Sequence, residues 1–358
     1  MIASIWSRIE RLPRRSALAL SVLLVVATGA VDYLTGSEAS ISIFYAIPVG
    51  LASWAVSRRS GIIISVASAV VWYFADLLCS PSYSSPVVPF WNALVMFTFF
   101  TVTACALSAL RASLEREIAL ARQIQAGLLP RQMPTIPGLQ VTSAWLPARF
   151  VSGDYYDVMR IGSTLVGFCI ADVAGHGMHA ALLMSNFQAA FRLLGSTNPA
   201  PKTLCSRLNE FVTANSGTEK FITFFYGVLD TNTNVLVYAN AGHNSPILVH
   251  VDGSAIELCD GGIPLGVVDE FPYDEGEVKL APGDLMVVYT DGVVESRDES
   301  GDMFGMERLR NLLLTCHRAG ARGVRDSIVN AIAKFGVRNL EDDVTLLVLS
   351  RIDGETGL

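Results

Sequence analysis

LVGFCIADVAGHGMHAA, residues 165–181, is the stretch that decides the fold of the C-terminal half of the chain. Its first seven residues are apolar and have the length and flanks of a buried strand. That strand would deliver Asp172 to its end, and Gly175 and Gly177 would then allow a tight turn into a helix. A carboxylate at a strand tip beside a glycine-rich turn is a common position for a metal ligand. The stretch therefore predicts a strand, a turn and a helix around one candidate ligand, Asp172.

Three further acidic clusters strengthen the interpretation as a cation site. They are SGDYYD at 152–157, YTDG at 289–292 and EDDVT at 341–345. Carboxylates gathered at neighbouring strand ends repel one another unless a cation neutralises them. Hard oxygen ligands with few histidines nearby favour Mg²⁺ or Mn²⁺ over Zn²⁺. Two such ions ~3.5–4 Å apart can bind a phosphoryl oxygen and activate a water molecule, so the pattern indicates metal-assisted phosphoester hydrolysis.

From Leu139 onward the chain predicts an α+β domain rather than a doubly wound parallel sheet, because short strands come in runs with helices grouped between them. We expect strands at Gln140–Leu146, Leu165–Ala171, Thr223–Leu229, Val235–Ala239, Ile247–His250, Leu285–Tyr289 and Val344–Ser350. We expect helices at about Ala180–Leu194, Pro201–Asn215, Glu307–Leu314 and Val324–Phe335. No G-x-G-x-x-G or Walker A motif is present, so nucleotide binding of those kinds is unsupported.

Charge divides the chain into two halves that suit different surroundings. Residues 1–130 carry nine Lys and Arg against six Asp and Glu, whereas residues 131–358 carry 17 against 27. The acidic half argues against nucleic acid as a partner, because nucleic acid binds to a basic face. Acidic side chains gathered around cations fit this half better.

Four apolar runs in the first 110 residues predict about four transmembrane helices, each near the ~20 residues needed to cross a bilayer. They are Ser16–Val31, Ile41–Ser57, Gly61–Ala75 with a short extension, and Val88–Leu110. Arginines at 8–15, at 58–59 and from 111 onward mark the cytoplasmic side, since the loops on the other side carry no Lys or Arg. A cleaved signal peptide is the alternative for the first 30 residues, and the three further runs disfavour it.

A linker helix over 111–129 continues the last apolar run and ends at Pro130. One face of it is an apolar stripe with helical spacing: Leu110, Leu114, Ile118, Ala121, Ile124 and Leu128. The stripe packs either on the protein's own C-terminal domain or on its copy in a homodimer. We hypothesise that this helix carries a signal from the membrane to the catalytic domain. The expected domains are a membrane domain over 1–110, a linker over 111–130 and a catalytic domain over 131–358.

Six motifs occur in an order that resembles the metal-dependent PPM (PP2C-type) serine/threonine phosphatases, and more narrowly their bacterial SpoIIE/RsbU-like branch. They are SGDYYD, ADVAGHGMHAALLM, NAGHNSPIL, GGIPLGV, YTDGVVES and EDDVTLLVL, preceded by the linker motif ALARQIQAGLLP. The resemblance covers about residues 115–350 and leaves the membrane half outside. It implies a β-sandwich flanked by helices, so the fold expected for the whole chain is an all-α membrane domain plus an α+β PPM phosphatase domain.

The resemblance also implies the ligands of two Mn²⁺ or Mg²⁺ ions. Asp172 would bridge both metals, and the carbonyl of Val173 would bind one of them. Asp154 would serve the same metal as Val173, directly or through water. Asp291 and Asp342 would hold the other. The four aspartates would thus form the catalytic centre, with Val173 as a further metal ligand.

Other polar residues near these motifs receive weaker assignments. Asp343 stands where other branches have Asn, so it is a candidate for a third metal or for supporting the ligands. Asp157 is a weaker metal candidate, and Arg149 lies near the stretch where relatives carry an arginine for the substrate phosphate. Three histidines are assigned structural positions rather than zinc binding or acid catalysis: His176 in the turn, His179 at a helix start and His243 in a strand-end turn.

The function implied is that of a protein phosphatase in the bacterial inner membrane, with its catalytic domain in the cytoplasm. Metal-activated water would attack phosphoserine or phosphothreonine, and the implied substrate is a STAS-domain anti-sigma-factor antagonist. Two alternatives remain open. One is a small-molecule phosphohydrolase with the same metals. The other is a non-catalytic membrane scaffold, which the retained carboxylates disfavour because clustered unpaired charge is costly without a function.

Overall fold

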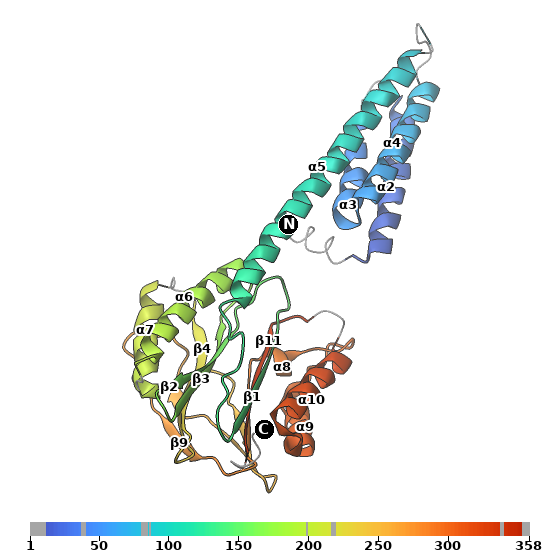
Figure 1. The fold of residues 1–358 in the computed structure, drawn as a ribbon. Helices are drawn as coiled ribbons and strands as arrows, with labels where there is room; N and C mark the ends of the chain where they lie inside the picture. The colour runs from blue at the N-terminus through green and yellow to red at the C-terminus, as the bar shows by residue number, and fades with distance from the viewer. Residues whose placement is uncertain are drawn as a thin grey trace. The chain divides into compact units, whose positions relative to one another are not determined.

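The computed structural model contains two compact units, Met1–Glu117 and Ile118–Leu358 (Figure 1). The division falls within one long helix, α5 (Val87–Ala126). The residues that the structure describes are 12–36, 41–79, 85, 87–197, 200–215, 220–336 and 340–352.

The N-terminal unit is helical and largely apolar. Its elements are α2 (Arg14–Thr35), the 3₁₀ turn η2 (Ser42–Tyr45), α3 (Ala46–Ala55), α4 (Arg58–Cys79) and the first part of α5. In the described part of the chain, α2, α4 and α5 are long and apolar enough to cross a membrane. At the second expected span, Ile41–Ser57, the structure has a shorter apolar helix, Ser42–Ala55. A helix of that length rises only about 20 Å, less than the ~30 Å hydrocarbon core, so three of the four expected spans are long enough to cross it unaided.

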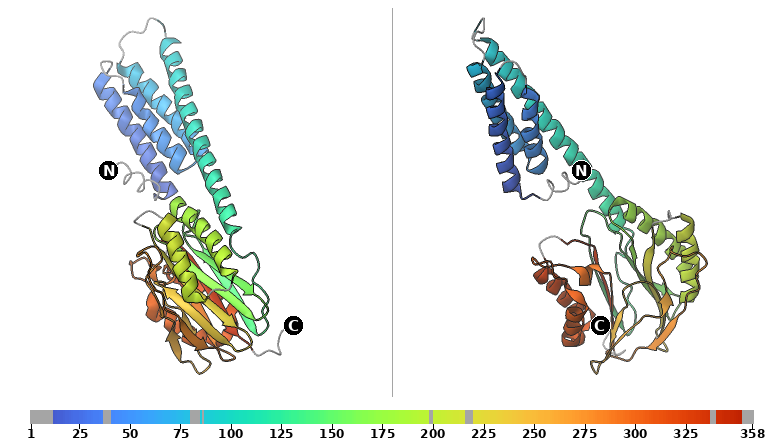
Figure 2. Two further views of the ribbon diagram at one scale, coloured as in Figure 1. Left: turned by 90° about the vertical axis from the view of Figure 1, so that its left-hand side faces the viewer. Right: turned by 180° about the vertical axis from the view of Figure 1, so that it is seen from behind.

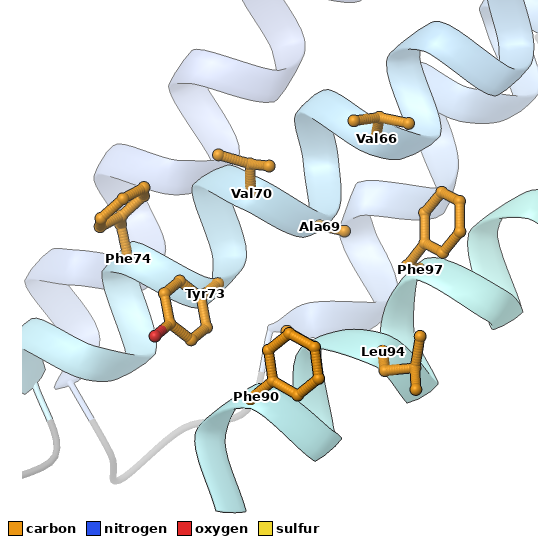
Figure 3. Close-up of a pocket in the computed structure, with 9 residues that line it drawn as sticks. Val66, Ala69, Val70, Tyr73, Phe74, Phe90, Leu94 and Phe97 are labelled. Carbon is orange, nitrogen blue, oxygen red and sulfur yellow. The ribbon is translucent and has the colours of Figure 1, made fainter. Parts of the chain in front are cut away.

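Helices α4 and α5 border an apolar groove on this unit. The groove has a volume of about 470 Å³, and Tyr73 of α4 and Phe90 of α5 face each other across it (Figure 3). Val66, Leu94 and Phe97 line it further along the two helices. Apart from the Tyr73 hydroxyl, these side chains are hydrocarbon. A lining of this kind suits hydrocarbon surroundings better than water.

The C-terminal unit contains two β-sheets. One has the strand order β1-β11-β10-β6-β7 and the other β2-β3-β4-β5-β8, with β9 also paired to β5. The strands are β1 (Leu139–Leu146), β2 (Tyr155–Ile161), β3 (Leu165–Val173), β4 (Ile222–Asp230), β5 (Val235–Ala241), β6 (Ile247–Val249), β7 (Ala255–Glu257), β8 (Gly261–Gly262), β9 (Gly276–Lys279), β10 (Leu285–Tyr289) and β11 (Val344–Arg351). All these pairings are antiparallel except β5 with β8.

Helices cover both outer faces of the two sheets (Figures 1 and 2). They are α6 (Met178–Gly195), α7 (Pro201–Asn215), α8 (Gly292–Glu295), α9 (Gly305–Cys316), η3 (His317–Ala319) and α10 (Gly320–Phe335). Strand β10 shows how one strand serves two cores. Met286 and Val288 join the large core between the sheets, while Leu285 and Val287 join the core beneath α9 and α10. The unit therefore has four layers, helices–sheet–sheet–helices.

All seven expected strands and all four expected helices of this unit are present, with end shifts of up to four residues. The prediction of a layered α+β domain is confirmed. Strand β2 and the short strands β7, β8 and β9 were missed. In β2 the residues Tyr155 to Val158 are buried in succession, so the strand lacks the apolar–polar alternation that marks a half-exposed strand.

An ion pair between a buried aspartate and a half-exposed arginine ties β2 to α6. The Asp157 side chain is fully buried and accepts hydrogen bonds from Arg192 Nη2 at 2.8 Å and from the Tyr155 hydroxyl at 2.6 Å. Arg192 Nε lies 2.5 Å from the second carboxylate oxygen of Asp157. Asp157 is therefore committed to this pair, away from the other acidic residues singled out in the sequence.

Replacing Arg192 with methionine should lower the free energy of unfolding by about 3 kcal/mol, because it leaves the buried Asp157 carboxylate without its counter-charge. Urea denaturation of the full-length protein in nanodiscs measures the change. The control is Lys202→Met at the Lys202–Glu275 pair, where the glutamate is 26% exposed instead of fully buried and the expected loss is below about 0.5 kcal/mol. Equal losses in the two variants would contradict the structural role given to Asp157.

Candidate metal centre

The register of one sheet brings Asp154 and Asp172 together. Strands β2 and β3 are antiparallel, with Tyr155 opposite Ala171. The residue before Tyr155 is Asp154 and the residue after Ala171 is Asp172, so the two carboxylates lie side by side at the strand ends. Asp154 is buried, whereas Asp172 is partly exposed.

The other sheet contributes Asp291 and Asp342 at the same edge of the sandwich. Strand β10 ends two residues before Asp291, and β11 begins two residues after Asp342. The two strands are antiparallel neighbours, so the end of β10 lies beside the start of β11. Asp342 is exposed, and its Oδ1 accepts a hydrogen bond from the backbone N–H of Asp343 at 2.8 Å.

Asp154 links the two sheets. Its Oδ2 accepts hydrogen bonds from the hydroxyls of Thr290 at 2.9 Å and Thr345 at 2.5 Å. Thr290 directly follows β10, and Thr345 belongs to β11. The Thr345 N–H donates in turn to the Thr290 hydroxyl at 2.9 Å. A buried carboxylate of the first sheet is thus held by two side chains of the second, which fixes the spacing of the sheet edges.

Three of the four aspartates, Asp154, Asp172 and Asp291, have raised pKa values. Burial and then the charges of Asp291 and Asp342 raise the pKa of Asp172 to about 7. Burial and then the charge of Asp342 raise the pKa of Asp291 to about 6. Burial and the charge of Asp172 raise the pKa of Asp154 well above its usual value. The structure therefore brings the four predicted ligands within electrostatic range of one another.

The segment 148–153 is fastened to this cluster by Asp343. One Asp343 carboxylate oxygen accepts a hydrogen bond from the Ala148 N–H at 2.8 Å and the other from the Gly153 N–H at 3.0 Å. Gly153 lies so close to the site that an added Cβ would be 3.1 Å from the Val173 carbonyl oxygen and 3.5 Å from Asp172 Oδ1. The Val173 carbonyl is thus near the cluster, and Asp343 supports the segment that carries Asp154.

Comparison with known proteins identifies the family. Residues 162–352 match the family model described as stage II sporulation protein E (SpoIIE). The chain belongs to the SpoIIE family. It is 30% identical over 246 residues to the phosphoserine phosphatase RsbU of Bacillus subtilis, a match covering 68% of this chain and 73% of RsbU. It is 27% identical to the protein IcfG of a Synechocystis species, where the match covers 66% of this chain but only 41% of IcfG.

Solved structures agree with this placement. The PP2C domain of SiaA from Pseudomonas aeruginosa has 25% identity and a TM-score of 0.61, covering 69% of this chain and all of that domain. The RsbU and RsbW domains of a Mycobacterium tuberculosis protein have 26% identity and a TM-score of 0.55, covering 63% of each chain. The sequence prediction of a PP2C-type phosphatase domain of the SpoIIE/RsbU branch is confirmed.

The acidic residues of this SpoIIE-family chain fit the metal ions that its family implies. Among the residues that the structure describes, no three acidic, histidine or cysteine side chains converge on one point as a ready-made ligand set. The carboxylates nevertheless lie at one edge, and repulsion from neighbouring carboxylates, added to burial, raises the pKa values of Asp172 and Asp291. A divalent cation among them would remove that repulsion. The donors are oxygens, as Mg²⁺ and Mn²⁺ prefer.

His243 bridges the two sheets as a neutral side chain. Burial lowers its pKa to about 4. The neutral ring accepts a hydrogen bond from the Thr223 hydroxyl at Nδ1, 2.8 Å away, and donates from Nε2 to the Tyr289 carbonyl at 3.1 Å. Thr223 on β4 lies opposite Asp172 on β3. Through its two hydrogen bonds, His243 therefore connects the neighbour strand of Asp172 to the end of β10. The structural assignment made from the sequence agrees with these contacts.

The remaining candidates lie where they have no contact with the four aspartates. His176 is exposed in the turn after β3, and His179 is the exposed second residue of α6. Arg149 is exposed in the segment 148–153. Sequence reasoning missed two threonines, Thr290 and Thr345. Their positions next to Asp291 and within EDDVT were the available signal, because hydroxyls beside ligand carboxylates often hold them in place.

Replacing Gly292 with alanine should weaken metal binding by about 10–100-fold and lower the free energy of unfolding by about 1–3 kcal/mol. An added Cβ would lie 2.1 Å from the Asp343 carbonyl oxygen, which forces the Asp291 segment away from Asp342. Mn²⁺ titration and thermal unfolding measure both effects. The control is Gly195→Ala in α6, where the nearest atoms are 3.7 Å away and no loss is expected. Unchanged Mn²⁺ affinity in Gly292→Ala would contradict the placement of Asp291.

Proposed function

We propose that this protein is a membrane-anchored, metal-dependent phosphatase that hydrolyses phosphoserine or phosphothreonine in proteins. The observation that carries the proposal is the position of Asp154, Asp172, Asp291 and Asp342 at one edge of the sandwich, supplied by both sheets. Family membership and the likeness to the phosphoserine phosphatase RsbU support the reaction type.

In this proposal the cluster would hold two Mn²⁺ or Mg²⁺ ions, and Asp172 would contribute to both. Asp154 and the Val173 carbonyl would hold one ion, and Asp291 and Asp342 would hold the other. The ions would supply Lewis acidity and activate water for attack on the phosphoryl group. The chain needs no nucleophilic side chain of its own. Its residues would bind the ions and keep the ligands in position.

Residues around the ligands have positioning functions. Thr290 and Thr345 keep the Asp154 carboxylate oriented, and neutral His243 keeps the sheet edges together. Asp343 supports the neighbouring segment, because both of its carboxylate oxygens already accept backbone hydrogen bonds. We therefore prefer a supporting function for Asp343 over direct metal binding.

We further propose that the helical unit spans the bacterial inner membrane four times and leaves the catalytic unit in the cytoplasm. Three candidate spans and the arginines at 58–59 and beyond 110 support this orientation. The apolar stripe of α5 supports a homodimer, because Leu114 and Ile124 are 43% and 70% exposed on the single chain. Relatives of the RsbU type make a STAS-domain anti-sigma-factor antagonist the substrate we propose.

Phosphate release by the full-length protein in nanodiscs tests the reaction. The substrates are a phosphoserine-containing STAS-domain protein and a small phosphate monoester, each with Mn²⁺ and with EDTA. Turnover of the phosphoprotein that requires Mn²⁺ is the expected result. Faster turnover of the small ester would favour a small-molecule phosphohydrolase, and Mn²⁺-independent or absent turnover of both would contradict the proposal.

A further inference from the structure

Gln125 makes an unusual contact between the end of helix α5 and the candidate metal centre. Its side-chain amide donates from Nε2 to the Ser152 carbonyl at 2.6 Å, and its Oε1 accepts from the Ser152 N–H at 2.9 Å. Gln125 is 3% exposed and Ser152 is fully buried. One side chain thus holds both polar groups of a single residue, which fixes the tilt of that backbone as well as its position.

Ser152 stands two residues before the ligand Asp154. The three successive N–H groups of Ser152, Gly153 and Asp154 are each held by a side chain: by Gln125, by Asp343 at 3.0 Å and by the Ser152 hydroxyl at 3.0 Å. Two of these three anchors come from residues outside the segment. The backbone that carries Asp154 is therefore held in place from two directions, by α5 on one side and by the residue before β11 on the other.

We propose that Gln125 is a positioning residue that sets the metal affinity of the centre by holding the Ser152–Asp154 backbone. This inference rests on the proposed function, since it takes Asp154 as a metal ligand. Without the two hydrogen bonds, the backbone of Ser152 must find other partners in a buried place, and the segment shifts or loosens. Asp154 moves with it, and ligands displaced in this way typically bind metal 10–100-fold more weakly.

A purely structural function of Gln125 makes a different prediction. It would lower the stability of the folded protein and leave the Mn²⁺ affinity of folded molecules unchanged. Leu129, which is 6% exposed and joins the core of the same unit, provides a comparison of that kind. Leu129→Ala loosens the packing of the chain just after α5 and leaves both hydrogen bonds of Ser152 to Gln125 in place.

The test is Mn²⁺ titration of the full-length protein in nanodiscs after stripping with EDTA. Gln125→Met keeps the length of the side chain and removes both hydrogen bonds, so its Mn²⁺ affinity should fall 10–100-fold, with activity restored at saturating Mn²⁺. Gln123→Met, at an exposed position of the same helix, and Leu129→Ala should bind Mn²⁺ like the wild type.

Unchanged Mn²⁺ affinity in Gln125→Met overturns the inference, whatever happens to its melting temperature, and so does an equal fall in Leu129→Ala. If Gln125→Met does not fold, Gln125→Glu carries the test. It keeps the bond accepted from the Ser152 N–H and loses the donated one, and unchanged affinity in it overturns the inference equally. A wild-type protein that binds no Mn²⁺ would instead overturn the proposed function on which this inference depends.

Discussion

Asp172→Asn should reduce Mn²⁺-dependent phosphate release by roughly 10³-fold, the largest loss expected for any single substitution in this protein. Asp172 stands at the centre of the acidic cluster, because its pKa responds to Asp291 and Asp342 of the other sheet as well as to burial. Asparagine keeps the size of the side chain and removes the charge that would attract two cations. The loss should appear in kcat and in Mn²⁺ affinity, while the fold is retained.

Phosphate release and Mn²⁺ titration of the full-length protein check this expectation. The matched control is Asp302→Asn, an exposed aspartate outside the cluster, which should keep wild-type activity. A wild-type melting temperature of Asp172→Asn in EDTA, or a higher one, would show that the loss is not due to unfolding. Activity within about tenfold of the wild type would mean that the chemistry takes place without Asp172, and the proposed centre would be wrong.

The layers of the catalytic unit could be predicted from local patterns. Strands such as β3 and β10 are short apolar runs that end in acidic or glycine-rich turns, and helices α7 and α10 carry regular amphipathic stripes. Strand β2 was not predicted because both of its faces are buried, which removes the alternation of apolar and polar residues. In the N-terminal unit, the apolar content of Ser42–Ala55 was visible in the sequence, but its shortness as a helix was not.

Some residues of the candidate site could likewise be predicted from the sequence, and others could not. Asp172 and Asp291 could be found because each comes at the end of an apolar run, Asp172 directly and Asp291 after one threonine. The bridge of Asp154 to Thr290 and Thr345 joins residues 136 and 191 positions apart, and only the packing of the two sheets creates it. The contact of Gln125 with Ser152 is equally invisible, because an amide in an amphipathic helix has no pattern of its own.

Removal of metal should make the stability of the protein fall as the pH rises from about 4 to about 8. The folded pKa values of Asp172 and Asp291, about 7 and about 6, lie above the usual value of 3.8. Between these limits the two carboxylates bind more protons in the folded than in the unfolded state, so their contribution to the free energy of unfolding decreases with increasing pH. Bound Mn²⁺ should reverse the trend above pH 7, because cations bind the deprotonated carboxylates and stabilise only the folded state.

Asp172→Asn isolates the contribution of this carboxylate from all other titrating groups. In EDTA the variant should be more stable than the wild type by about 4 kcal/mol at pH 8, and the difference should vanish below about pH 3, where Asp172 is protonated in both states. With saturating Mn²⁺ the order should invert, since only the wild type gains the full binding energy. Urea denaturation at pH 5, 6, 7 and 8 measures both curves. A stability difference that does not change with pH in EDTA would show that folding does not raise the pKa of Asp172. The case for a cation at this edge would then depend on Asp291 and Asp342 alone.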